Sequence, residues 1–272
     1  MILIADSGST KTDWAVLDEK GTEMARIRTQ GMNPFHLSSE EIKGIIYGEL
    51  IPFLPSGHPT AISFFGTGCT PDQIPMMRKL LMETMACDNV VVGSDLLGAA
   101  RALCGDGEGI ACILGTGANS CLYDGHEIVA NIPPLGYILG DEGSGAVLGK
   151  MFLNAIFKGF LSEEIKQLYL QESHQTYADI IRKVYREPLA NRYLASTAKF
   201  ISAHMADYPE LSTLVKDNFR GFIHRNIDRY NRKDLPLNFV GSIAYFFQSE
   251  LREVTEECGY RLGRVVQSPL DR

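Results

Sequence analysis

The feature that most constrains the fold of this chain is a strand–turn–strand pattern that occurs twice. The apolar run at residues 2–5 leads into a polar, glycine-containing turn at residues 6–12, and residues 14–17 are apolar again. The same order returns over residues 110–123. Two separated copies of one unit indicate an internal duplication. Because strands and helical segments alternate after both copies, we expect an α/β fold.

Both turns have the composition of a phosphate-binding loop. Glycine tolerates positive φ and lets a ligand approach the backbone closely, while Ser, Thr and Asn add side-chain donors. Successive N–H groups in such a turn can form an anion-binding concavity. One such turn alone is more typical of an ordinary hairpin loop. Two of them facing each other across a cleft would hold the phosphates of a nucleotide from both sides.

Composition narrows the class of protein. The 272 residues carry a formal net charge of -7, which argues against nucleic acid as the main partner. The longest apolar region, residues 146–161, contains Lys150 and Lys158 and is too short to cross a membrane, and the first residues do not resemble a signal peptide. None of the six cysteines forms a Cys-x-x-Cys pair, which favours reduced thiols in a cytoplasmic protein over disulfides or zinc.

The order of the predicted elements gives two domains, with the glycine-rich residues 105–109 at their boundary. Residues 1–108 predict three strands within 2–29, a loop at 31–35, and then in turn a helix at 38–50, a strand at 61–65, a helix at 71–85, a strand at 90–92 and a helix at 95–103. Residues 109–272 predict strands within 110–130, a loop at 131–140, a helix at 145–157, a helical insertion at about 160–232, a strand at 237–240, a helix at 243–258 and a last strand at 262–267.

Three motifs carry a resemblance to the sugar kinase, Hsp70 and actin superfamily. Asp6-x-Gly8-x-Thr10-Lys11-Thr12 resembles its phosphate-1 hairpin, Gly115-Thr116-Gly117 its phosphate-2 turn, and Phe239-Val240-Gly241-Ser242 its adenosine motif. Within the superfamily, Gly31-Met32-Asn33, residues 93–95 and the run at 136–144 resemble the BadF/BadG/BcrA/BcrD ATPase group and its N-acetylglucosamine kinases. The resemblance implies a two-domain ribonuclease H-like (actin-like ATPase) fold with ATP and sugar in the interdomain cleft.

The resemblance implies contacts to ATP from the two phosphate motifs and the adenosine motif. These are Gly8, Ser9, Thr10, Lys11, Thr12, Gly115, Thr116, Gly117, Gly241 and Ser242. Strand propensity alone would also explain Thr10 and Thr12, and Lys11 can simply face solvent. Asp6 ends the first strand, where a carboxylate can hold Mg²⁺ directly or through water. A turn-initiating aspartate would occupy the same position.

Asp95 is the candidate catalytic base. It follows a buried apolar strand, which would place its carboxylate at the floor of a cleft, and sugar phosphorylation needs a base for the attacking hydroxyl. Capping of the following helix by Ser94 and Asp95 would explain the same two residues.

Amino-sugar recognition calls for short side chains that donate and accept hydrogen bonds. The resemblance assigns it to Asn33, Asp95, Ala118, Asn119, Gly136, Tyr137, Asp141 and Glu142. Either Asp141 or Glu142 could be the acidic contact, and Glu142 could instead favour the start of the next helix. Tyr137 stands where some relatives carry Trp.

The function expected from these residues is transfer of the ATP γ-phosphate to the 6-hydroxyl of N-acetylglucosamine or a related amino sugar. An ATPase activator of a radical enzyme would hold a [4Fe–4S] cluster through two cysteines per chain. The absence of cysteine between Cys121 and Cys258 disfavours it. A non-catalytic sugar sensor finds no support because Asp6 and Asp95 are both present.

The helical stretch carries no predicted site, and the C-terminus departs from the resembling family. In the helical stretch the histidines are isolated, and the apolar residues would form core or a homodimer face. Members of the resembling family commonly continue past the last strand into a helix that returns to the first domain. The sequence here stops at residues 268–272, so we expect that helix to be missing.

Overall fold

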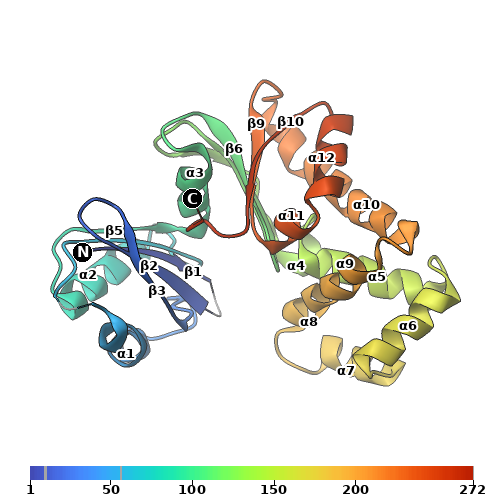
Figure 1. Ribbon diagram of the computed structural model, residues 1–272, viewed down its shortest axis with the longest axis horizontal. Helices are drawn as coiled ribbons and strands as arrows, with labels where there is room; N and C mark the ends of the chain where they lie inside the picture. Colours follow the sequence, from blue (N-terminus) through green and yellow to red (C-terminus); the bar gives the residue numbers. More distant parts are fainter. Residues whose placement is uncertain (9–10, 56, 272) are drawn as a thin grey trace. The chain divides into compact units, whose positions relative to one another are not determined.

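The computed structural model describes residues 1–8, 11–55 and 57–271. They form two compact units, one of Met1–Ala102 with the C-terminal residues from Pro269, the other of Leu103–Ser268. Each unit is built on its own five-stranded sheet (Figure 1). The residues 105–109, predicted as a linker, lie in the second unit.

The first unit has a mixed sheet in the order β3-β2-β1-β4-β5. Its strands are β1 (Ile2–Ser7), β2 (Lys11–Leu17), β3 (Glu23–Gln30), β4 (Ala61–Gly66) and β5 (Val90–Ser94). The first three form an antiparallel meander, whereas β4 and β5 run parallel to β1. Ser7 pairs with Gly66, which pairs with Ser94, so the carboxyl ends of three parallel strands meet at one edge.

The second unit repeats this topology, with the order β10-β9-β6-β7-β8. Its strands are β6 (Gly109–Leu114), β7 (Ala118–Tyr123), β8 (Ile128–Asn131), β9 (Pro236–Val240) and β10 (Arg261–Val266). Again the first three strands form an antiparallel meander, and the last two continue the sheet in parallel with the first. The internal duplication and the α/β class predicted from the sequence are therefore confirmed.

The helices of the first unit follow the predicted order. Helix α1 (Ser39–Ile45) begins with a capping box between Ser38 and Glu41, and continues as a π-helical turn over Ile46–Leu50 and a 3₁₀ turn over Ile51–Phe53. Helix α2 (Ile74–Met85) begins three residues later than predicted, because Pro75 and not Pro71 occupies its first turn. Helix α3 (Asp95–Cys104) follows β5 directly.

The helices of the second unit differ from the prediction at two points. A short helix, α4 (Gly136–Leu139), lies inside the segment predicted as a loop, and the helix predicted at 243–258 is broken at Phe247 into α11 (Ser242–Phe246) and α12 (Gln248–Glu257). The remaining helices are α5 (Gly145–Lys158), α6 (Glu163–Ser173), α7 (Tyr177–Tyr185), α8 (Ala190–Ser196), α9 (Ala198–His204), α10 (Pro209–Arg225) and the 3₁₀ helix Ile227–Tyr230.

Each unit has its own hydrophobic core. Trp14 of β2 and Phe64 of β4 are fully buried in the first core, with ring centroids 5.9 Å apart. In the second core, Phe222 of α10 packs on Phe239 of β9 with centroids 6.3 Å apart. Burial of these rings fixes α10 against the second sheet, which matters because α10 contributes to the site described below.

The C-terminal residues belong to the first unit. Leu270 packs with Ala15 and Leu17 of β2. The Arg26 guanidinium on β3 donates to the Leu270 carbonyl at 2.9 Å and to the Asp271 carboxylate at 3.0 Å. After β10 the chain thus returns to the first unit at Pro269.

Two further expectations concern the whole chain. All six cysteines are free thiols, as the cysteine pattern predicted. Within the described ranges, every helix is too short or too polar to cross a lipid bilayer.

Candidate functional site

Polar residues gather at the carboxyl edge of the first sheet. Asp6 lies at the end of β1, Thr67 directly follows β4, and Asp95 directly follows β5. The Thr67 N–H donates to the Ser7 carbonyl at 2.8 Å, and the Thr67 hydroxyl donates to Asp95 Oδ2 at 2.7 Å. The loop after β4 therefore connects the two strand ends that carry the aspartates.

Ser94, and not Asp95, caps helix α3. Ser94 Oγ accepts the N–H of Leu97 at 3.2 Å, which is the side-chain bond of an N-cap residue. The Asp95 carboxylate accepts the Leu96 N–H at 2.8 Å and the Thr67 hydroxyl. These two bonds fix its orientation, and the cap that the sequence allowed as an alternative is supplied by its neighbour.

Asp6 carries an unfavourable negative charge. Burial and the negative charges of Asp95 and Asp13 raise the pKa of Asp6 to about 6, although Lys11 opposes the shift. A cation bound by Asp6 would relieve both effects. The described residues contain no cluster of three or more metal-ligating side chains. Mg²⁺ needs only one or two carboxylates, because water and phosphate oxygens complete its octahedron, so the residues present fit this ion.

The turn between β1 and β2 contains both exposed and buried groups. Ser9 and Thr10, two predicted ATP contacts, lie outside the described residues. The Gly8 N–H donates to the Lys11 carbonyl at 2.9 Å, and the exposed Lys11 pairs with Asp13.

Thr12, the next predicted ATP contact, faces inward. Thr12 is 0% exposed, and its hydroxyl lies 2.8 Å from Ser7 Oγ and donates to the Gln30 carbonyl at 3.1 Å. The hydroxyl of Thr12 thus serves the hairpin and does not face outward, whereas Gly8 stays at the sheet edge.

Asn33 lies in a buried loop that contacts the same edge. Its Oδ1 accepts the Phe35 N–H at 2.9 Å. A Cβ atom on Gly68 would lie only 2.1 Å from this oxygen, and Gly68 has a φ of +84°. Glycine is required at position 68 because a side chain there would push Asn33 away from the loop after β4.

In the second unit, the turn at 115–117 is bonded to the start of α5 through its carbonyls. The Gly145 N–H donates to the Gly115 carbonyl at 2.8 Å, and the Ala146 N–H donates to the Thr116 carbonyl at 3.1 Å. Within the described part of the chain, the N–H groups of Thr116 and Gly117 have no hydrogen-bond acceptor. Successive free N–H groups in a glycine turn suit an anion such as phosphate.

Asp141 lies against this turn. Its Oδ2 would be 3.2 Å from a Cβ atom on Gly117. Burial raises the pKa of Asp141 to about 6; the N–H of Ala118 opposes the shift, while nearby Glu142 adds to it. Asp141 has a φ of +57°, a region that non-glycine residues seldom adopt. The turn holds this conformation because the Asp141 N–H donates to the Pro134 carbonyl at 2.8 Å and the Ser144 N–H donates to the Asp141 carbonyl at 3.0 Å.

Asn218 of α10 is a site residue that the sequence analysis missed. It is 1% exposed, its Oδ1 accepts the Gly143 N–H at 3.0 Å, and its Nδ2 donates to the Ser144 carbonyl at 3.2 Å. One side chain thereby binds the peptide groups that follow Asp141. In the sequence, only the position of Asn218 among the apolar residues of an amphipathic helix pattern could have indicated it.

Two other predicted residues lie beside the same turn. Gly241 has a φ of +122°, and a Cβ atom there would lie 2.3 Å from the Leu114 carbonyl oxygen. The turn before α11, with the exposed Ser242, therefore packs on the backbone next to Gly115. Asn119 is the second residue of β7, and its side-chain oxygen is bonded to Asn131 at 2.9 Å.

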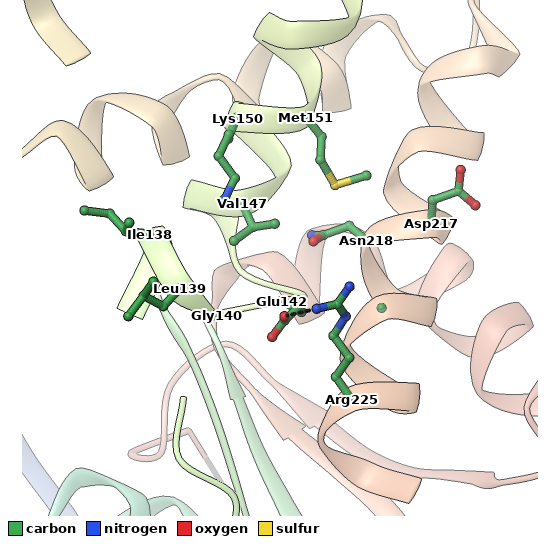
Figure 2. Close-up of a pocket in the computed structure, with 11 residues that line it drawn as sticks. Ile138, Leu139, Gly140, Glu142, Val147, Lys150, Met151, Asp217, Asn218 and Arg225 are labelled. Atoms are coloured by element: carbon green, nitrogen blue, oxygen red, sulfur yellow. Dashed lines mark ion pairs between the residues drawn. The ribbon is translucent and has the colours of Figure 1, made fainter. Parts of the chain in front are cut away.

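Glu142 has surroundings different from those of Asp141. It lines a cavity of about 340 Å³ between α4, α5 and α10, where it pairs with Arg225 at 3.3 Å (Figure 2). Lys150 donates to the Tyr137 carbonyl at 3.1 Å and so holds α4, with Gly136 at its start, beside this cavity. Ser144 caps α5 by accepting the Val147 N–H at 3.1 Å. Of the two adjacent acids, Asp141 is the one placed at the Gly117 turn.

Known proteins similar to this chain are found among solved structures. No family model matches it, and no curated protein does. It is similar to the crystal structure of a candidate N-acetylglucosamine kinase from Porphyromonas gingivalis, with 50% identity, a TM-score of 0.95 and coverage of 99% of this chain and 96% of that chain.

More distant structures share the fold. A candidate N-acetylglucosamine kinase from Chromobacterium violaceum is 16% identical, with a TM-score of 0.75 and coverage of 97% and 94% of the two chains. A ROK family glucokinase from Streptomyces griseus, in complex with glucose and AMPPNP, is 14% identical, with a TM-score of 0.61 and coverage of 97% and 93%. The predicted two-domain ribonuclease H-like fold is confirmed.

Proposed function

Because the chain belongs to the N-acetylglucosamine kinase-like family of sugar kinases, we propose that it transfers the γ-phosphate of ATP to the 6-hydroxyl of N-acetylglucosamine or a related amino sugar. The observation that carries the proposal is the carboxylate of Asp95. Hydrogen bonds from Thr67 and Leu96 orient this carboxylate at the strand ends next to Asp6. Because Ser94 caps helix α3, the Asp95 carboxylate is not needed as the cap.

Asp95 acts as the base in this proposal. The attacking hydroxyl gives its proton to the Asp95 carboxylate while its oxygen bonds to the γ-phosphorus and the bond to the ADP oxygen breaks. The hydrogen bonds from Thr67 and Leu96 hold the carboxylate in one rotamer, so little reorganisation is needed when the proton arrives.

ATP binds through backbone groups in this proposal. The phosphates are bound by the N–H groups of Thr116 and Gly117 and by the turn at Gly8. The adenine base lies against the turn at Gly241 and Ser242. The AMPPNP complex of the Streptomyces griseus glucokinase supports the use of ATP. Asp6 would hold Mg²⁺, which neutralises phosphate charge when bound.

The sugar is bound in this proposal by the polar and aromatic residues that the resemblance assigns to it. Asp141 accepts hydrogen bonds from sugar hydroxyls, Asn119 donates, and Ala118, Gly136 and Tyr137 border the acetamido group. Asn33 shapes the loop that packs on Gly68. Glu142 has its own partner in Arg225 and acts on Asp141 only through its charge. Free cysteines support a cytoplasmic location in this proposal. The partners in the proposal are two small molecules, ATP and the amino sugar.

The test is ADP release with Mg-ATP and a panel of N-acetylglucosamine, glucosamine, N-acetylmuramate, N-acetylmannosamine and glucose, with a control that lacks sugar. We expect release that depends on an amino sugar. Asp95→Asn should lose about 10²- to 10⁴-fold in kcat and still bind ATP. Asp88→Asn is the matched control, because Asp88 is exposed before the opposite end of β5.

Three outcomes would contradict the proposal. Turnover of Asp95→Asn at the wild-type rate removes Asp95 from the role of base. Equal ADP release with and without sugar indicates an ATPase. No release with any sugar of the panel argues against an amino-sugar kinase.

A further inference from the structure

The amide of Asn119 is held in one orientation by a group that can only donate. Its Oδ1 lies 2.9 Å from the backbone nitrogen of Ser120. A backbone N–H is always a donor, so the side-chain atom that faces it must be the oxygen. This settles the two ends of the amide on chemical grounds, which matters because oxygen and nitrogen of an asparagine are otherwise easily exchanged.

Asn131, at the end of β8, fixes the same amide a second time. Its Nδ2 lies 2.7 Å from the Ser120 carbonyl oxygen and 3.3 Å from the Ile132 carbonyl oxygen. Carbonyl oxygens only accept, so this atom of Asn131 must be the nitrogen. The same nitrogen lies 2.9 Å from Asn119 Oδ1 and donates to it.

The backbone around the pair is fixed independently by Tyr230. Its hydroxyl donates to the Ser120 carbonyl at 2.9 Å and accepts the Ile132 N–H at 3.2 Å. Burial raises the pKa of Tyr230 to about 12, so the phenol remains a donor at neutral pH. Tyr230 therefore secures the ends of β7 and β8, while Asn131 is the side chain that acts on the amide of Asn119.

With its oxygen bonded twice, Asn119 keeps only its NH₂ group for a ligand. Its side chain is partly exposed, and no described residue accepts a hydrogen bond from its Nδ2. We infer that Asn131 is a positioning residue that makes Asn119 a pure hydrogen-bond donor toward the substrate. This inference rests on the proposed function. The substrate group that faces Asn119 must then be an acceptor oxygen, from a hydroxyl or an amide, and not an ammonium group.

Pairs of deoxy and fluoro sugars test the polarity of this contact. Fluorine can accept weakly but cannot donate, and hydrogen does neither. At one hydroxyl other than the phosphorylated one, we expect the deoxy sugar to lose about tenfold in kcat/KM and the fluoro sugar clearly less. If the contact is instead to the acetamido oxygen, N-acetylglucosamine should exceed glucosamine by a similar factor.

Variants of Asn131 identify the residue responsible. Asn131→Asp places a carboxylate oxygen against the carbonyls of Ser120 and Ile132, and Asn131→Ala removes the donor. Both variants should raise KM more than they lower kcat. Both should also reduce the difference in kcat/KM between the deoxy and fluoro sugars, or between N-acetylglucosamine and glucosamine, that the wild type shows. Tyr230→Phe is the control. It loosens the same strand ends without touching the amide of Asn119, so it should lower stability and keep the difference.

The outcomes separate the inference from the proposed function. The inference alone is overturned if two results are found together. The deoxy and fluoro sugars have equal kcat/KM at every position, and N-acetylglucosamine has no higher kcat/KM than glucosamine. A difference that survives in both Asn131 variants also overturns the inference alone. Absence of turnover with every sugar contradicts the kinase. In that case calorimetric binding of the same analogues without ATP decides the inference, and no binding of any of them overturns it.

Discussion

At the scale of single residues, Asp6 and Asp141 hold protons more tightly than aspartates in water. Each has a pKa raised to about 6, chiefly by burial. A carboxyl group whose folded-state pKa is raised stabilises the protein fully below its unfolded pKa, near 4, and loses this contribution as pH rises through the folded pKa. Ionised Asp6 therefore costs stability above pH 6, where the proposed metal binding needs its charge.

We predict opposite effects of Asp6→Asn on stability and activity. Without metal, thermal unfolding should show a larger gain in Tm at pH 7.5 than at pH 4.5, because only the charged form is penalised. Activity should be lost at both pH values. In the wild type, kcat/KM should fall as pH drops below about 6, where Asp6 and Asp141 take up protons. Equal Tm changes at the two pH values would show that burial does not penalise this carboxylate.

Single residues also differ in how much of their role the sequence predicts. The position of Asp95 after an apolar strand was predictable, but only the structure assigns the cap to Ser94 and gives Asp95 a hydrogen bond from Thr67. The hydroxyl of Thr12 looked equally suited to a phosphate and to a strand. Its inward direction depends on Ser7 and on the carbonyl of Gln30, which are contacts that spacing along the chain does not reveal.

At the scale of elements, α10 is attached to the turn that carries Asp141 through Asn218. Asn218→Ala would leave the buried Gly143 N–H and Ser144 carbonyl without this partner, at a cost of about 1–3 kcal/mol. We predict that this variant raises the KM for the sugar about tenfold with a smaller change in kcat. It should also shift the pH at which kcat/KM falls on the acid side, to which the protonation of Asp141 contributes.

Asn226→Ala separates that effect from a general loss of stability. Asn226 is also buried and follows the same helix. Among the described residues, its Nδ2 donates only to the Phe222 carbonyl of that helix, at 3.2 Å. It should lower the free energy of unfolding without changing the KM. A KM that rises equally in both variants, measured on folded protein, would mean that Asn218 has no special effect on the turn.

Elements were predictable where their cause is local. The capping box at Ser38 and Glu41 starts α1 as predicted, because both partners lie within one turn. Helix α4 was missed because its start depends on left-handed Leu135, at a φ of +62°, and its position on a bond from Lys150 to the Tyr137 carbonyl. Neither cause leaves a periodic pattern in the sequence.

At the scale of the whole molecule, the duplicated sheets were predictable because each repeats an apolar strand, a glycine turn and a second strand. The assignment of the last residues was not, because it depends on contacts between residues more than 200 positions apart. Leu270 packs on Ala15 and Leu17, and Arg26 binds the Leu270 carbonyl at 2.9 Å. The first unit is therefore completed by residues that follow the second unit in the chain.

This arrangement predicts that two leucines close together near the C-terminus stabilise different units. Leu270→Ala should destabilise the first unit by about 2 kcal/mol, the lower end for a buried leucine, because Leu270 is 9% exposed. Amide hydrogen exchange should then become faster in β1 and β2 and remain unchanged in β6 and β7. Leu262→Ala, only eight positions earlier, is the matched control, since Leu262 lies on β10 and packs on the core of the second unit. It should give the opposite pattern. Faster exchange in the same strands for both variants would mean that the last residues stabilise the molecule as one cooperative body, and that the two cores do not unfold separately.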